Sequence, residues 1–139
     1  MKIKIKYFDG TQKLVKQKNG DWVDLSIYRG KTVKKGGYYK LSLGVAMSLP
    51  NGYEAIIAPR SSTFEKWGLI QTNSIGVVDN SYSGPDDEWK MAVYATKDIK
   101  IPAHTRLCQF RIQQKMPPVT FIESDLSNNR NRGGFGSTG

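Results

Sequence analysis

Cysteine and histidine are almost absent from this 139-residue sequence, which contains one of each, Cys108 and His104. Disulfide frameworks and zinc sites need several such residues, so the sequence excludes both. Cys108 lies in the apolar run Leu107–Phe110, a setting that predicts a buried, inert thiol rather than a nucleophile. His104 lies in a predicted turn, where we expect a structural or solvated side chain rather than a catalytic one.

Long apolar runs are also missing. No stretch of the sequence approaches the roughly 20 apolar residues that cross a membrane. The basic, alternating start Met1–Lys6 has neither the apolar segment nor the small-residue cleavage site of a signal peptide. We therefore expect a soluble protein of a reducing, intracellular compartment.

Basic residues outnumber acidic ones, and the excess is local. The chain has 21 Lys and Arg against 12 Asp and Glu, a net charge of +9. Residues 1–40 hold eleven Lys and Arg against three acids, a net +8, and residues 41–139 hold ten against nine, a net +1. A basic face can bind nucleic acid, attract phosphorylated small molecules or be simply solvated. No aromatic residues interleave with the lysines of residues 2–6, which weighs against stacking on nucleic-acid bases.

Short segments rich in β-branched and aromatic residues alternate with turn signals, which predicts an all-β fold. The turn signals are Asp9-Gly10, Asn19-Gly20, Gly36-Gly37 and Pro50-Asn51-Gly52. The candidate strands are residues 2–7, Tyr39–Met47, Glu54–Ala58, Met91–Ala95, Leu107–Ile112 and Val119–Phe121. Short strands hide their edges best in a closed sheet, so we predict a single domain, a jelly roll or distorted β-barrel, over residues 1–123.

The segment Pro59–Ser62 closes a predicted strand and opens the one predicted helix, Ser62–Trp67. Ser61 or Ser62 is the expected N-cap, and Glu65 would complete a capping box with Ser62. Hydroxyls and free backbone N–H groups at such a helix start can bind an anion. An ordinary serine cap beside a surface Arg60 has the same sequence, so both interpretations stay open.

Two carboxylates stand beside apolar residues. Asp79 follows Gly76-Val77-Val78, which would partly desolvate it and suit it to accept a proton from water. An aspartate in a simple turn is the alternative. Asp24 lies between Val23 and Leu25 in a predicted strand; pointing inward it needs a cation, a metal or an arginine, and pointing outward it is solvated.

The polar, glycine-rich residues 124–139 predict a flexible C-terminal arm. Its glycines surround Phe135 and follow Arg130 and Arg132. Exposed backbone N–H groups and arginines suit phosphates, and an aromatic ring suits a base, which together indicate a nucleotide. A disordered, weakly RNA-binding tail has the same composition.

In their order and spacing, these segments resemble the five motifs of the trimeric dUTPase family. The matching segments are Trp22–Ile27, Pro59–Ser62, Asn73 with Gly76–Gly84, Arg106–Gln109 and Arg130–Gly139. Ser62 stands where many members of the family have glycine, Asn131 replaces the usual glycine, and Val23 departs from the pattern beside Asp24. The Lys-rich start and the turn Pro85–Trp89 resemble dUTPases of bacteriophages in particular.

The resemblance implies a β-clip fold and a Mg²⁺-dependent enzyme that hydrolyses dUTP to dUMP and diphosphate. It implies a homotrimer with active sites shared between subunits, located in the host cytoplasm if a phage encodes it. Asp79 would activate the attacking water, and Asp24 would hold Mg²⁺ through water. The implied substrate-binding residues are Arg60, Ser61, Ser62 and Gln109 for phosphates, Asn73, Gly76, Val78 and Tyr82 for the nucleoside, and Arg130, Phe135, Gly136, Ser137 and Thr138 in the arm.

Two other functions compete with this one. The dCTP deaminases have a similar fold and often carry Arg-Ser-Ser, as Arg60–Ser62 does, but they need a glutamate on the strand after the third motif. Met91–Tyr94, the corresponding segment, contains no acid. A non-catalytic module for nucleotide sensing or nucleic-acid binding is the other alternative, and it has no need of Asp24, Asp79 and Phe135, which are all present.

Overall fold

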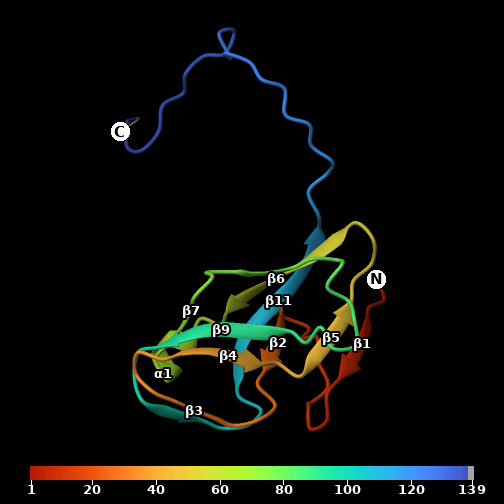
Figure 1. Cartoon of the computed structure of the whole chain (residues 1–139), viewed down its shortest axis with the longest axis vertical. Coiled ribbons are helices and arrows are strands. Elements are labelled where there is room, and N and C mark those ends of the chain that lie inside the picture. The colour runs from red at the N-terminus through yellow and green to blue at the C-terminus, as the bar shows by residue number, and fades with distance from the viewer. Residues whose placement is uncertain (138–139) are drawn as a thin grey trace.

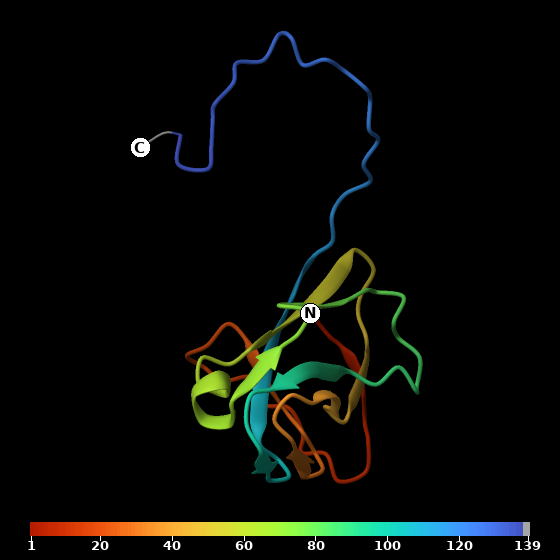
Figure 2. The same cartoon turned by 60° about the vertical axis from the view of Figure 1, so that its left-hand side comes forward.

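The computed structural model describes residues 1–137, which form eleven short strands and one helix. The strands are β1 (Lys4–Tyr7), β2 (Val23–Ser26), β3 (Lys31–Val33), β4 (Tyr38–Ser42), β5 (Val45–Ser48), β6 (Tyr53–Pro59), β7 (Leu69–Gln71), β8 (Gly76–Val78), β9 (Lys90–Ala95), β10 (Ile99–Ile101) and β11 (Arg106–Gln114), and the helix is α1 (Thr63–Trp67). The strands surround one core, and the chain beyond β11 leaves them as an extended arm (Figures 1 and 2). This arrangement confirms the predicted all-β fold with one short helix.

The largest sheet has four antiparallel strands in the order β2-β11-β6-β8. In its centre, Gln109 of β11 pairs with Asp24 of β2 on one side and with Ala58 of β6 on the other. Their neighbours Leu25 and Cys108 are fully buried, so Asp24 and Gln109 lie on the outer face of the sheet. Three motifs that are far apart in the sequence therefore meet on one face.

A β-bulge interrupts β11 where it pairs with β2. The register shifts between Arg106, which pairs with Ser26, and Cys108, which pairs with Leu25. On a regular strand Arg106 and Cys108 would point to the same side. The bulge instead buries Leu107 and Cys108 in succession and leaves Arg106 exposed on the outside.

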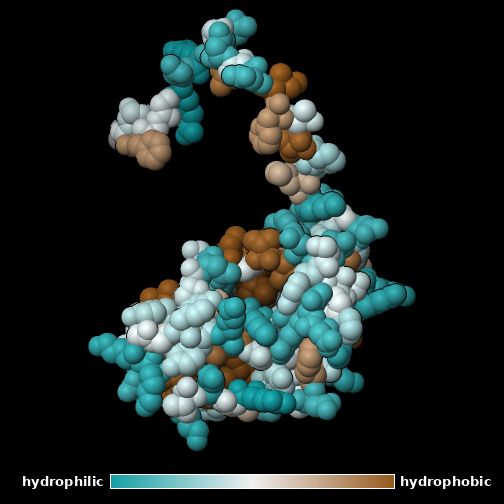
Figure 3. All heavy atoms as spheres, in the orientation of Figure 1, coloured by the Kyte–Doolittle hydropathy of each residue, from teal (hydrophilic) through white to brown (hydrophobic). Residues whose placement is uncertain are grey.

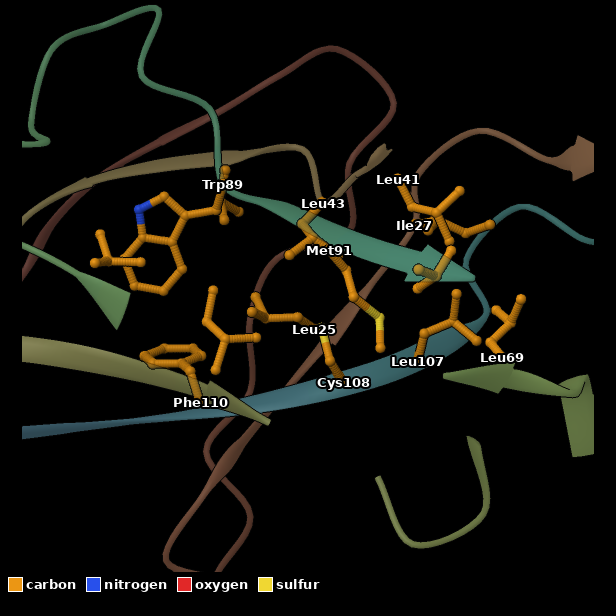
Figure 4. Packing of buried hydrophobic residues seen from close by; sticks show 14 of the residues in the cluster. Leu25, Ile27, Leu41, Leu43, Leu69, Trp89, Met91, Leu107, Cys108 and Phe110 are labelled. Carbon is orange, nitrogen blue, oxygen red and sulfur yellow. The ribbon is translucent and has the colours of Figure 1, made fainter. Parts of the chain in front are cut away.

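The core lies between the four-stranded sheet and the three-stranded sheet β4-β9-β7, with the pairs β1-β5 and β10-β3 completing the barrel. Trp89 packs edge-on against Phe110, with ring centroids 5.2 Å apart and an interplanar angle of 85° (Figure 4). Trp89 is 1% exposed. Trp89 is therefore a core residue.

Most predicted strands are present, and two predictions were wrong. The predicted strand Tyr39–Met47 is broken into β4 and β5 at Gly44, which has a φ of 70° that suits glycine. The predicted strand Val119–Phe121 does not form, because this segment lies away from the barrel and has no neighbouring strand. The short strands β3, β7 and β10 were missed, since three residues are too few to show an alternating pattern.

The helix begins where the sequence predicts, but its cap differs. Ser62 precedes α1 and makes no side-chain capping bond, so the expected capping box is absent. The hydroxyl of Thr63 instead bonds outside the helix: it accepts from the backbone N–H of Arg60 at 3.0 Å and donates to the Leu107 carbonyl at 2.6 Å. The start of α1 is thus tied to the bulge of β11.

Residues 115–137 form neither helix nor strand, and all of them are exposed. The extended segment therefore begins before residue 124, where the sequence pattern placed the arm. Within residues 1–137, no helix combines the length and the hydrophobicity that a membrane crossing requires.

Replacing Gly44 by alanine should test the turn between β4 and β5. An added Cβ would overlap the Thr11 hydroxyl and lie 2.8 Å from the Tyr28 ring. We expect Gly44→Ala to lower the free energy of unfolding by about 2–4 kcal/mol, from the left-handed backbone and from overpacking. The control is Gly52→Ala, at a φ of 82° with nothing within 4 Å of the added Cβ, which should cost about 1–2 kcal/mol. Equal losses for the two variants in chemical denaturation would contradict this account.

Candidate active site

The Asp24 carboxylate lies between two arginines on the outer face of the four-stranded sheet. Its Oδ1 is 3.1 Å from Nε of Arg60, and its Oδ2 is 3.1 Å from Nη1 of Arg106. The Asp24 and Arg60 side chains are 27% and 28% exposed, and that of Arg106 is 54% exposed. Asp24, which stands between apolar residues in the sequence, is therefore paired with two arginines. The three residues together carry one net positive charge.

The other predicted phosphate-binding residues surround this ion pair. Arg60, Ser61 and Ser62 form the turn between β6 and α1, and the Gln109 amide donates to the Pro59 carbonyl at 3.2 Å. The backbone N–H of Arg60 also lies 3.4 Å from the Leu107 carbonyl at the bulge. We call Asp24, Arg60, Ser61, Ser62, Arg106 and Gln109 the arginine cluster. It offers guanidinium N–H groups, hydroxyls and an amide, which are donors that suit phosphate oxygens.

A second set of predicted residues lines a hollow of about 380 Å³ on the other side of β6. We call it the β8 pocket. Asn73, Gly76, Val78 and Tyr82 line it as the sequence motif predicts, together with Lys40, Ile57, Val77, Glu88, Trp89 and Lys90. Its size is at the lower end of small-molecule sites and suits one nucleoside.

Gln71 holds the loop that carries Asn73, a role that the sequence analysis missed. Gln71 is 6% exposed, and its amide donates to the Ile57 carbonyl at 3.1 Å and to the Ser74 carbonyl at 3.4 Å. These bonds fix the loop between β7 and β8 against β6. A glutamine at an inward position of an apolar strand was the available signal, because a buried amide needs partners.

Tyr82 is held at both ends beside the β8 pocket. Its backbone N–H donates to the Asp79 carbonyl at 3.0 Å, and its hydroxyl donates to the Glu88 carbonyl at 2.9 Å. The side chain stays 41% exposed. Partial burial raises the pKa of the Tyr82 phenol, and the charges of Asp87 and Glu88 raise it further, so the hydroxyl remains a donor.

Asp79 lies directly after β8 and is exposed, so the expected partial desolvation is absent in the single chain. It is also far from the arginine cluster. Val78 pairs with Ala55 of β6, and Arg60 follows Ala55 by five residues, which span about 17 Å along a strand. One chain therefore does not bring Asp79 next to the arginine cluster.

The arm lies apart from both clusters. Arg130, Phe135, Gly136 and Ser137 are exposed in the segment that extends from the barrel (Figures 1 and 2). The backbone N–H of Gly134 donates to the Ser137 hydroxyl at 2.7 Å, which closes a small local turn. Thr138, the last predicted arm contact, lies outside the described residues.

Within residues 1–137, no group of three or more His, Cys, Asp or Glu could enclose a metal ion. Mg²⁺ commonly keeps several waters and is held by one or two carboxylates and by substrate phosphates. Asp24 uses one site on each carboxylate oxygen for an arginine, and its remaining lone pairs can accept bonds from water. This donor set fits a hydrated ion held through water.

The fold is that of a β-barrel protein, and the two clusters carry the kinds of groups that would suit a nucleotide. The dUTPase family model matches residues 15–139. The SPbeta prophage-derived deoxyuridine 5'-triphosphate nucleotidohydrolase of Bacillus subtilis is 52% identical over 140 residues, covering 100% of this chain and 99% of that protein. The chain belongs to the dUTPase family.

Solved structures agree on the fold. A variant of the Staphylococcus bacteriophage 80alpha dUTPase with dUpNHpp has a TM-score of 0.82 at 17% identity, covering 99% of this chain and 98% of that one. A variant dUTPase from phage phi11 of S. aureus, described with a structural Mg(II) ion, has a TM-score of 0.77 at 14% identity, covering 91% and 99%.

Cys108 should be unreactive in the folded protein. Complete burial raises the pKa of its thiol, and the nearby Asp24 charge raises it further. The reactive thiolate should therefore be absent at about pH 8.5, where an ordinary thiol is half ionised. We expect no modification by an aromatic disulfide reagent at this pH and one modified thiol per chain after denaturation. Rapid modification of the folded chain would contradict the buried position.

Proposed function

We propose that this chain hydrolyses dUTP to dUMP and diphosphate and so limits the incorporation of uracil into DNA. The observation that carries the proposal is the composition of the two clusters. The arginine cluster presents donors for a phosphate chain, and the β8 pocket presents backbone and side-chain groups for one nucleoside. A triphosphate of a small nucleoside needs both.

In this proposal the arginine cluster holds the phosphates. Arg60, Ser61, Ser62 and Gln109 donate to their oxygens. Asp24 keeps Arg60 in place, because the carboxylate fixes the guanidinium through Nε and leaves its other N–H groups for the ligand. Arginine forks bind phosphate in two parallel bonds, which adds direction as well as affinity.

The β8 pocket would select the base and the sugar. Asn73 and the backbone at Gly76 and Val78 read the polar edge of uracil. Tyr82 packs under the deoxyribose and leaves no room for a ribose 2′-hydroxyl. Discrimination against UTP would thus be steric.

Asp79 is the proposed general base. It accepts a proton from water as the water oxygen attacks the α-phosphorus in line. A new P–O bond forms, the bond to the β-phosphate bridging oxygen breaks, and diphosphate leaves with the bonding electrons. Mg²⁺, held through water by Asp24, would neutralise charge on the triphosphate.

We further propose that the protein works as a homotrimer with shared active sites. The distance between Asp79 and the arginine cluster within one chain supports this, since association can bring Asp79 of one copy next to the arginine cluster of another. Exposed apolar side chains support it too. They are Ile75 and Val77 beside the β8 pocket and Met116, Val119, Phe121 and Ile122 in the extended segment, and Figure 3 shows hydrophobic patches both over β6 and along this segment.

Residues 124–139 would act as a flexible arm that closes over a neighbouring copy's site. Phe135 would stack on the uracil, and Arg130 would reach the γ-phosphate. Gly136, Ser137 and Thr138 would add backbone and hydroxyl donors to the phosphates. Closure would exclude all water except the attacking molecule. We place the protein in the cytoplasm, that of the host if a phage encodes it.

Diphosphate release from dUTP, UTP, dTTP and dCTP, with and without Mg²⁺, should test the proposed function. We expect Mg²⁺-dependent release from dUTP alone. Asp79→Asn should keep the fold and dUTP binding but lower turnover by about 10³-fold or more, because the base is lost and the shape is kept. Near-normal turnover by Asp79→Asn would contradict its role, and ammonia release from dCTP would indicate a deaminase.

Mixed oligomers should show whether the site is shared. One inactive variant is Asp79→Asn, and the other is Ser61→Ala with Gln109→Ala, which loses two phosphate donors. If each site combines Asp79 of one copy with the arginine cluster of another, refolding an equal mixture should restore about a quarter of normal activity, one half times one half. Mixing without refolding is the control. No recovery after refolding would mean that each site is built within one chain.

A further inference from the structure

Glu88 connects the β8 pocket to the turn between β4 and β5. Its Oε1 accepts from the backbone N–H of Gly44 at 3.1 Å, and its Oε2 accepts from the Ser42 hydroxyl at 3.3 Å. The side chain is half-buried and lines the β8 pocket. The next residue, Trp89, is buried in the core, and its backbone bonds with Val45 and Leu43 fix the chain at this point. Glu88 is thus held rigidly from two directions.

The backbone carbonyl of Glu88 is the acceptor for the Tyr82 hydroxyl. Among the hydrogen bonds of residues 1–137, this is the one that fixes the Tyr82 ring. The residues between them form a separate turn, in which Asp87 accepts from the backbone N–H of Gly84 at 2.8 Å. That turn is exposed at Asp86, whose contact with Lys6 is 3.8 Å long. The position of the Tyr82 ring therefore depends on Glu88.

We propose that Glu88 is a positioning residue for sugar selection: its carboxylate clamp on Ser42 and Gly44 fixes the carbonyl that holds Tyr82. The proposal rests on the proposed function, in which Tyr82 packs under the deoxyribose. Steric exclusion of a 2′-hydroxyl works only if the ring cannot retreat. Loss of the clamp lets the Tyr82 ring move outward, and UTP then enters the β8 pocket.

The clamp is specific to Glu88 among the three acids of this turn. Asp86 points to solvent, with its side chain 95% exposed. Asp87 bonds within the turn. Glu88 alone, of the three, bonds to the β4–β5 turn. Asp86→Asn therefore serves as a matched control that removes a neighbouring charge and leaves the clamp intact.

The test compares kcat/KM for dUTP and for UTP in Glu88→Ala, Glu88→Gln and Asp86→Asn. We expect Glu88→Ala to lower the dUTP-to-UTP ratio about tenfold, the effect of one net hydrogen bond on the ring position, mainly through faster UTP hydrolysis. Glu88→Gln should retain most of the selectivity, because its amide oxygen still accepts from Gly44. Asp86→Asn should keep the ratio of the unmodified chain. A Glu88→Ala enzyme that loses the same factor on both substrates would overturn the proposal.

Tyr82→Phe tests the same link without touching Glu88. It keeps the ring and removes the hydroxyl that bonds to the Glu88 carbonyl. We expect the same fall in selectivity, and the double variant with Glu88→Ala should fall no further, since both changes release one ring. Additive effects in the double variant would overturn the proposal. An unchanged ratio in Tyr82→Phe would also overturn it, and this ratio can be measured even if Glu88→Ala does not fold. Absence of dUTP hydrolysis by the unmodified chain would instead overturn the proposed function.

Discussion

The bulge in β11 is the constraint on which the arginine cluster depends. It buries Leu107 and Cys108 in succession and turns Arg106 outward to Asp24. It also leaves the Leu107 carbonyl free of the β2 ladder, and that carbonyl accepts from the Thr63 hydroxyl at the start of α1. One extra residue in one strand thus sets the position of both arginines. Bulges commonly re-aim a side chain in this way beside functional sites.

The charge arrangement of the cluster follows from this geometry. A half-buried carboxylate alone would be costly, and two arginines alone would repel each other. Placed together, they leave one net positive charge and several unused guanidinium N–H groups at the edge of the sheet. Such a cluster is stable without a ligand and still attracts a polyanion. The excess of lysine in residues 1–40 adds to the positive charge of the chain, which favours approach of a polyanion.

Sheet geometry separates the clusters, and this separation shapes the proposed mechanism. Asp79 follows an edge strand, β8, whereas Asp24 lies on the opposite edge strand, β2, with β11 and β6 between them. A rigid sheet cannot fold back to join its two edges. In the proposed trimer, association of copies would bring the two together, and it would also cover the exposed apolar side chains of the outer face and of the extended segment. The hydrogen bonds that fix Tyr82 are consistent with the proposed selection of the sugar, because a pocket excludes a 2′-hydroxyl by steric contact only if its side chains stay in place.

The sequence by itself determined the class of fold, the family and the identity of several residues that gather in the two clusters, among them Asp24, Arg60, Asn73 and Tyr82. Alternation, turn residues and motif order are local properties, and they were sufficient to predict the strands around Glu54–Ala58, Met91–Ala95 and Leu107–Ile112. Tertiary structure alone decided the bulge, the hydrogen bonds of the Thr63 hydroxyl and the break at Gly44. It also decided that arginines are the partners of Asp24, and that Glu88 and Gln71 brace the β8 pocket. Each of these depends on a contact between residues that are distant in the chain. A local sequence pattern does not indicate which distant group supplies a hydrogen bond, a charge or a steric limit.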